Sequence, residues 1–250
     1  RRFEEGFAQE HDCRHAVFCN SGTSALQIAL QALKEQQGWA DGDEVIVPAV
    51  TFIATSNIVL HNRMTPVFAD VDTRTYTLDP AKFAAAIGPK TRAVIPVHLL
   101  GLPADMDPIR EIAAKKGIKI IEDSAETMFA RYKGRKVGSL GDIGCFSTYV
   151  AHYIVTGVGG LATTNEPDLH VRLRSLINHG RDSIYLSIDD DATATGAKLH
   201  EIVAKRFKFV SVGHSYRATE FEAALGLAQL EEKEGIVAAR VDLARRLSAG

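Results

Sequence analysis

Residues 93–123 read AVIPVHLLGLPADMDPIREIAAKKGIKIIED and contain the pattern that decides the fold. The apolar run Ala93–Val97 predicts a short buried strand. The pair Asp107-Pro108 predicts the start of a helix, which Gly117 ends in the usual way. Ile118–Ile121 then predicts a second strand. A strand, a helix and a strand in this order are typical of a parallel sheet covered by helices.

The same alternation continues along the rest of the chain. Further strands are predicted at Glu44–Val47, Pro66–Ala69, Gly144–Ser147 and Gly160–Thr163. Further helices are predicted at Ser24–Glu35, Ile53–His61, Asp168–Asn178, Thr219–Lys233 and Gly235–Ser248, and another opens at Asp79-Pro80. We therefore expect an α/β fold of three layers, a mostly parallel sheet flanked by helices. The long polar segment Asp182–Gly196 is expected to form an exposed loop.

Composition narrows the class of protein. The 250 residues are 46% hydrophobic and 24% charged, which suits one large domain with a full core. The net charge of -2 argues against nucleic acid and membrane surfaces as partners. Cys13, Cys19 and Cys145 are too scattered for a disulfide framework or a metal site, so Cys145 is expected to be a core filler. With no long apolar run and a charged start, we expect a cytoplasmic protein.

Two polar segments follow or precede predicted elements. Asn20–Ser24 stands directly before a predicted helix, where amide and hydroxyl groups could hold a phosphate. The alternative is that these residues are ordinary helix caps. Asp123 ends a predicted buried strand, which costs free energy unless a cation or a donor is present. A protonated pyridine nitrogen would be such a donor, and capping of the next turn is the alternative.

A set of motifs in a fixed order is more specific than either segment. They are SGTSAL at 21–26, VPAVTFIAT at 47–55, EDSAE at 122–126 and YKGRKVGSLGDIGCFS at 132–147. Together they resemble the DegT/StrS-type nucleotide-sugar aminotransferases, which are pyridoxal-phosphate enzymes of fold type I. The resemblance implies a cofactor-binding large domain at 1–233. It also implies that 234–250 begins a helix leading to a smaller C-terminal domain.

The resemblance also implies roles for individual residues around pyridoxal 5'-phosphate or pyridoxamine 5'-phosphate. Gly22, Thr23 and Ser147 match positions that hold the cofactor phosphate. Phe52 matches an aromatic ring that stacks on the pyridine, and Asp123 matches the carboxylate that binds the ring nitrogen.

Glu126 departs from the family pattern, because relatives have Gln or His beside the phenolic oxygen of the cofactor. An ionised carboxylate would repel a phenolate, so Glu126 is expected to be protonated or turned away. Ser215 matches an asparagine that reaches the cofactor phosphate of the neighbouring subunit, which implies a homodimer with shared sites. Tyr216 and Arg217 are expected to meet the substrate, and pairing of Arg217 with an acid on its own helix is the alternative.

His152 stands where the family has its Schiff-base lysine, five residues after Ser147, and no lysine occurs between Lys136 and Lys198. An imidazole cannot form the linkage that a primary amine forms. The same exchange marks a branch of the family that this chain resembles, the pyridoxamine-phosphate-dependent sugar 3-dehydratases. In those enzymes the cofactor amine is held noncovalently and condenses with a nucleotide-linked 4-keto-6-deoxyhexose, the histidine removes a proton from the methylene carbon of the cofactor, and the C3 hydroxyl leaves.

An altered or engineered aminotransferase and a noncatalytic cofactor-binding relative are the alternatives to a dehydratase. Val158 replaces an acid of the family pattern, and Tyr153 replaces a second histidine of the dehydratases. An amino donor such as glutamate is implied as a further partner of an active enzyme.

Overall fold

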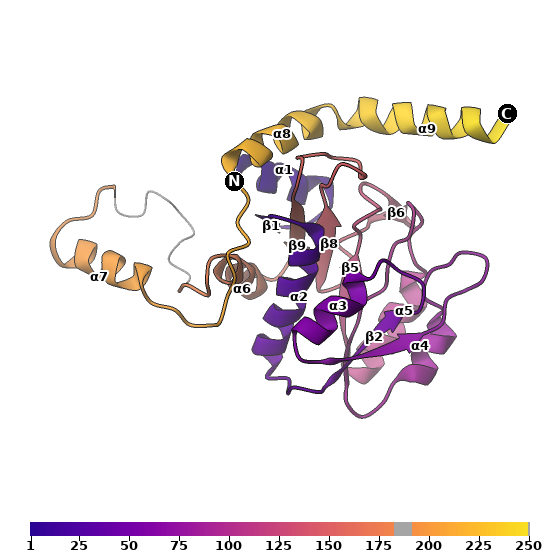
Figure 1. The fold of residues 1–250 in the computed structure, drawn as a ribbon, viewed down its shortest axis with the longest axis horizontal. Coiled ribbons are helices and arrows are strands. Elements are labelled where there is room, and N and C mark those ends of the chain that lie inside the picture. Colours follow the sequence, from indigo (N-terminus) through magenta and orange to yellow (C-terminus); the bar gives the residue numbers. More distant parts are fainter. Residues whose placement is uncertain (183–191, 250) are drawn as a thin grey trace.

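The computed structural model describes residues 1–182 and 192–249, and its centre is a seven-stranded sheet in the order β1-β9-β8-β5-β4-β2-β3 (Figure 1). The strands are β1 (His15–Cys19), β2 (Glu44–Pro48), β3 (Thr65–Ala69), β4 (Thr91–Val94), β5 (Lys119–Asp123), β8 (Ile143–Ser147) and β9 (Gly160–Thr164). A separate small hairpin consists of β6 (Arg131–Tyr132) and β7 (Arg135–Lys136).

The helices are α1 (Arg2–Glu10), α2 (Gly22–Gln37), α3 (Ala54–His61), α4 (Pro80–Ala86), α5 (Met106–Lys116), α6 (Pro167–Ile177), α7 (Gly196–Arg206), α8 (Glu220–Glu231) and α9 (Lys233–Ala249). None of the helices in the described ranges is long and apolar enough to cross a membrane.

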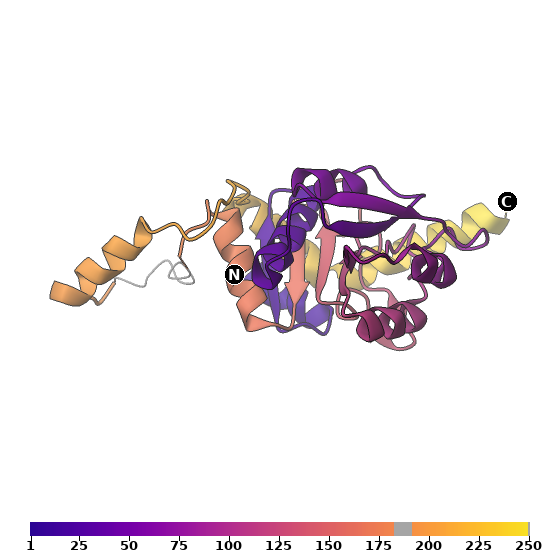
Figure 2. The ribbon, with the colours of Figure 1, turned by 90° about the horizontal axis from the view of Figure 1, so that it is seen from below.

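The sheet is mostly parallel, as the sequence predicts. β3, β2, β4, β5 and β8 pair in parallel, whereas β9 runs antiparallel to both β8 and β1. Parallel strands need both faces covered, and three apolar clusters provide that cover. One face packs against α2, α3 and α6. The other face packs against α1 and α8 at one end and against α4 and α5 at the other (Figure 2). The expected three-layer α/β fold is therefore confirmed.

The strand expected at Ala93–Val97 ends earlier, at Val94. Pro96 has no N–H for the ladder, and Val97 forms only an isolated bridge with Asp123. The carbonyl of Pro96 nevertheless accepts the N–H of Asp123 at 3.0 Å, so the chain stays beside β5 up to the end of that strand.

Other boundaries differ because a cap or a break lies elsewhere than the sequence suggests. α5 begins at Met106 after Asp105, one position before the Asp107-Pro108 pair. The helix expected at Thr219–Lys233 ends at Glu231, and α9 begins at Lys233. Most of the loop expected at 182–196 lies outside the described residues, and Gly196 begins α7.

Several elements were not predicted from the sequence, and these are α1, β1, α7 and the β6–β7 hairpin. Phe3 and Phe7 of α1 are buried, one helical turn apart, which is the pattern that could have revealed this helix.

All three cysteines are buried, and burial raises the pKa of the Cys13 and Cys19 thiols to about 12. Burial also raises the pKa of Cys145, which packs in the core of β8 as expected.

A fully buried carboxyl group, that of Glu122 in β5, ties the sheet to the segment before β8. One oxygen accepts the N–H groups of Leu140 and Gly141 at 2.7 and 2.6 Å. The other accepts the N–H of Gly138 at 2.8 Å and lies 3.0 Å from Nε2 of His98. These bonds satisfy the polar groups of a turn that would otherwise be buried without partners.

We predict that Glu122→Gln lowers the free energy of unfolding by about 3 kcal/mol, because an amide NH2 would then face backbone N–H donors. Urea denaturation followed by circular dichroism measures this. The matched control is Glu111→Gln, which removes one exposed ion pair with Lys115. The control should change stability by less than about 0.5 kcal/mol. Equal effects of the two variants would contradict the role of Glu122.

Candidate functional site

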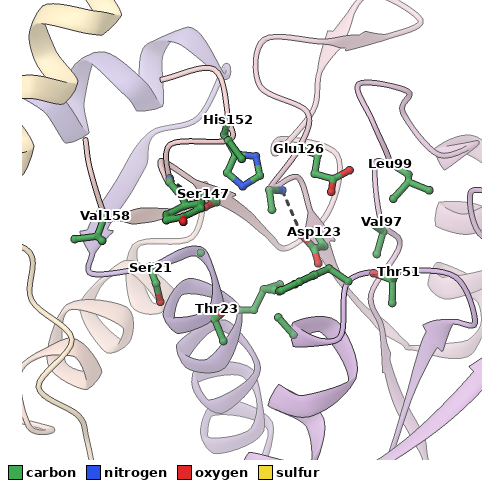
Figure 3. A pocket seen from close by; sticks show the side chains of 18 of the residues that line it. Ser21, Thr23, Thr51, Val97, Leu99, Asp123, Glu126, Ser147, His152 and Val158 are labelled. Carbon is green, nitrogen blue, oxygen red and sulfur yellow. Dashed lines mark hydrogen bonds between the residues drawn. The ribbon is translucent and has the colours of Figure 1, made fainter. Parts of the chain in front are cut away.

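A pocket of about 470 Å³ lies where the carboxyl ends of β5 and β8 meet the N-terminus of α2 (Figure 3). Ligands of open α/β sheets bind at this end of the strands. The residues predicted from the sequence that line the pocket are Gly22, Thr23, Phe52, Asp123, Glu126, Ser147 and His152. Residues that are far apart in the sequence are therefore brought to one cavity.

The N-terminus of α2 forms one end of the pocket. Ser21 caps the helix, and its Oγ accepts the N–H of Ser24 at 3.0 Å. Gly22 approaches β8 so closely that an added Cβ would lie 2.7 Å from the Cβ of Ser147. The approach brings the partial positive charge of the helix terminus beside the Ser147 hydroxyl, and together they suit an anion such as a phosphate. Ser21 thus caps the helix, and the helix terminus still faces the pocket.

The pocket wall has no strong positive charge of its own. No lysine or arginine is found among the described residues that line it. An anion in this cavity would therefore be held by helix N–H groups and hydroxyl groups. Asn20 also lines the pocket, and its buried Oδ1 accepts no hydrogen bond from the described part of the chain. Such a buried acceptor without a donor marks a place for a ligand donor or a water molecule.

Asp123 is almost fully buried at the end of β5, and burial raises the pKa of its carboxyl group. Its Oδ2 accepts the hydroxyl of Thr55 at 2.8 Å, and its Oδ1 accepts the N–H of Ala125 at 3.2 Å. The second bond is the turn capping that the sequence left as an alternative, and it coexists with a place in the pocket wall. A cationic N–H donor in the pocket would stabilise the ionised form of Asp123.

Thr55 was not singled out from the sequence, although it belongs to the motif at 47–55. It lies in α3, where its side chain is buried, and the hydroxyl of Thr51 lies 2.8 Å from its own. The spacing of four residues between the two threonines was the available signal. Phe52, in the same motif, remains 70% exposed at the mouth of the pocket, where an aromatic ring is free to stack on a planar ligand.

Glu126 is held by a neighbouring loop. Its Oε2 accepts the N–H of Leu100 at 2.9 Å. Figure 3 shows the carboxyl group directed to the side of Leu99 rather than to His152. That Glu126 is protonated or turned away from a phenolic oxygen of the cofactor stays a prediction.

His152 lies on the loop that joins β8 to β9, and its half-buried ring projects into the pocket near Ser147 (Figure 3). Burial lowers the pKa of the imidazole, the charge of Glu126 raises it, and the charge of Arg240 lowers it. The net direction is downward, so the ring is neutral near pH 7 and can accept a proton.

Ser215, Tyr216 and Arg217 do not line this pocket. Arg217 donates to Oδ1 of Asn178 at 2.6 Å and to Oγ of Ser215 at 3.1 Å. These partners of Arg217 differ from the alternative expected from the sequence, which was an acid on its own helix. The ring of Tyr216 stacks on His214 with 4.4 Å between the ring centroids.

The chain is similar to characterised proteins over almost its whole length. It is 44% identical to a GDP-perosamine synthase of Caulobacter vibrioides over 95% of this chain and 58% of that protein. It is 37% identical to the spore coat polysaccharide biosynthesis protein SpsC of Bacillus subtilis over 98% of this chain and 60% of that protein. The chain thus spans less than two thirds of the length of these relatives.

Solved structures agree with the fold. An aminotransferase from Psychrobacter cryohalolentis superposes with a TM-score of 0.82 and 39% identity over 93% of this chain and 55% of that one. A GDP-4-keto-6-deoxy-D-mannose-3-dehydratase of Escherichia coli, with bound hydrated PLP, has a TM-score of 0.87 and 28% identity over 98% of this chain and 62% of that one. A sequence profile of the DegT/DnrJ/EryC1/StrS aminotransferase family matches residues 1–250. The chain belongs to the DegT/DnrJ/EryC1/StrS aminotransferase family.

Proposed function

We propose that this protein binds a vitamin B6 cofactor noncovalently, as pyridoxamine phosphate, and removes the C3 hydroxyl of a nucleotide-linked 4-keto-6-deoxyhexose. One observation carries the proposal. This chain belongs to a family that uses pyridoxal phosphate, yet its pocket contains the imidazole of His152 and no lysine among the described lining residues. The solved 3-dehydratase that this chain resembles supports the reaction class.

The pocket has the groups that such a cofactor needs. The N-terminus of α2 and the hydroxyl of Ser147 suit its phosphate. Phe52 is free to stack on the pyridine ring, and Asp123 is a buried carboxyl group that no lysine or arginine among the described residues pairs with. A protonated ring nitrogen would supply a cation and would gain a strong hydrogen bond in return.

His152 is the proposed proton-transfer group. When bound, the cofactor supplies an amine that condenses with a keto sugar and a ring that withdraws electrons from the reacting carbon. The neutral imidazole of His152 can accept a proton at that carbon and return one later. Asp123 would keep the nitrogen of a bound pyridine ring protonated, and the N–H of Leu100 holds the carboxyl group of Glu126.

Amino transfer is a second candidate, because sequence identity favours it. The chain is 44% identical to a GDP-perosamine synthase but 28% identical to the 3-dehydratase. A protein close to the aminotransferases could make an aminosugar without the lysine if pyridoxamine phosphate were supplied in each turnover.

The two candidates separate in one assay with His152 variants. The protein is given pyridoxamine phosphate and GDP-4-keto-6-deoxymannose, and the products are identified by mass spectrometry. We expect loss of the C3 hydroxyl by the unaltered protein and a rate lower by about 10²–10⁴ in His152→Asn, which cannot accept the proton. An exposed histidine provides the control, His61→Asn.

His152→Lys should gain a covalent bond to pyridoxal phosphate that borohydride traps, visible in the intact mass. Aminated sugar as the only product of the unaltered protein would favour amino transfer. Full activity of His152→Asn would exclude His152 as the base.

We also propose that the working unit is a homodimer with shared sites. Ser215 and Arg217 lie outside the pocket of their own chain. The pocket itself has no cation to hold the phosphates of a nucleotide, at least among its described lining residues. Arg217 of a second copy would supply that charge.

Mixing two inactive variants tests this arrangement. His152→Asn and Arg217→Ala each remove one half of a site. In a mixed dimer one of the two sites then contains both intact residues, so about a quarter of the original activity should return. Activity that does not rise above that of the separate variants after subunit exchange would contradict shared sites.

A further inference from the structure

The loop that carries His152 is fixed at its base. Thr148 and Gly159 close it through an N–H to carbonyl bond of 2.9 Å. The hydroxyls of Thr148 and Thr156 lie 2.6 Å apart, and the N–H of Thr156 donates to the carbonyl of Thr148 at 3.0 Å. These bonds hold both ends of the loop to β8 and β9 but do not reach its middle, where His152 lies.

The middle of the loop is held from outside by the two C-terminal helices. Gln229 of α8 accepts the N–H of Val155 at 3.1 Å. Arg240 of α9 donates to the main-chain carbonyl of His152 at 2.7 Å. The same guanidinium lies over the ring of Tyr153, 4.8 Å from its centroid. Figure 1 shows α8 and α9 following one another along the edge of the body that carries this loop.

α9 has few other contacts with the rest of the fold. None of its residues is buried, and its other contacts are with α8, with Glu10 of α1 through Lys233, and with the apolar cluster of α1 through Ile236. The contacts found for the guanidinium of Arg240 in the described part of the chain are its hydrogen bond to His152 and its stacking over Tyr153. Its charge is therefore directed to the carbonyl of His152 and the ring of Tyr153, two groups of the reacting loop.

We propose that Arg240 is a positioning residue, which fixes the backbone of His152 and the ring of Tyr153 and so aims the imidazole into the pocket. The inference rests on the proposed function, in which the imidazole moves the proton. The N–H of His152 donates to the carbonyl of Tyr149 at 2.9 Å, so both of its backbone groups are bonded when Arg240 is in place. Both bonds restrict the directions that its side chain can take.

The positive charge of Arg240 has a second effect on the imidazole. The charged groups acting on it are Glu126, from the segment after β5, and Arg240, from α9. Burial lowers the pKa of His152, Glu126 raises it and Arg240 lowers it. Loss of the guanidinium removes a charge that disfavours the imidazolium, so it raises the pKa of His152.

The test uses the full chain without cofactor or substrate. The pKa of His152 is measured by NMR titration of its ring, and amide hydrogen exchange is measured across residues 150–156. Arg240→Ala should raise the pKa of His152 and speed exchange in the loop by about threefold. Arg240→Lys keeps the charge but not the planar group over Tyr153. Arg240→Lys should therefore return the pKa of His152 close to its value in the unaltered protein, whereas amide exchange in the loop should remain faster than in the unaltered protein.

The matched control is Arg246→Ala on the same helix, where the side chain pairs with Asp242 and does not touch the loop. If Arg240→Ala matches this control in both the pKa and the exchange rate, Arg240 is not a positioning residue. In turnover, Arg240→Ala should lower kcat with little change in KM. Because the two NMR measurements need no reaction, failure of the positioning role is distinguishable from failure of the proposed activity.

Discussion

The close approach of Gly22 to Ser147 is the contact on which the rest of the site depends. A side chain at position 22 would meet Ser147, so only glycine allows the N-terminus of α2 to reach the end of β8. Gly160 of β9 makes a similar approach, since an added Cβ would lie 2.4 Å from the carbonyl carbon of Ser21. With a helix terminus and strand ends this close, backbone N–H groups replace charged side chains as the means of holding an anion.

The electrostatics of the pocket follow from that arrangement. Its described lining includes the carboxyl groups of Asp123 and Glu126 and the imidazole of His152, but no permanent cation. Asp123 is the carboxyl group at which a bound cation gains most, because it is buried and already oriented by Thr55. Glu126 is occupied by a backbone N–H, and His152 is kept neutral by its burial. Each of the three groups therefore lies in a different electrostatic environment.

The strand and helix order and the mostly parallel sheet could be predicted from the sequence, because periodicity is a local property. Helix-start and strand-end positions also indicated Asn20–Ser24 and Asp123, whereas Phe52, Glu126, Ser147 and His152 were expected in the site only from the family resemblance. Long-range contacts could not be predicted in this way. Thr55 supports Asp123 across 68 positions, and Arg240 reaches the loop of His152 across 88. Pro96 shortened a predicted strand, since its missing N–H outweighed the apolar pattern. The positions of Ser215 and Arg217 outside their own pocket are likewise a consequence of tertiary structure.

We propose that a B6 ring binds between Phe52 and Asp123 with its nitrogen against the carboxyl group. The most direct measurement is the ¹⁵N chemical shift of the ring nitrogen of labelled pyridoxamine phosphate bound to the protein. We expect a ring nitrogen that stays protonated at a pH where the free cofactor has lost this proton, and that loses the proton in Asp123→Asn. A ring nitrogen that titrates as in free solution, or that is unaffected by Asp123→Asn, would contradict it.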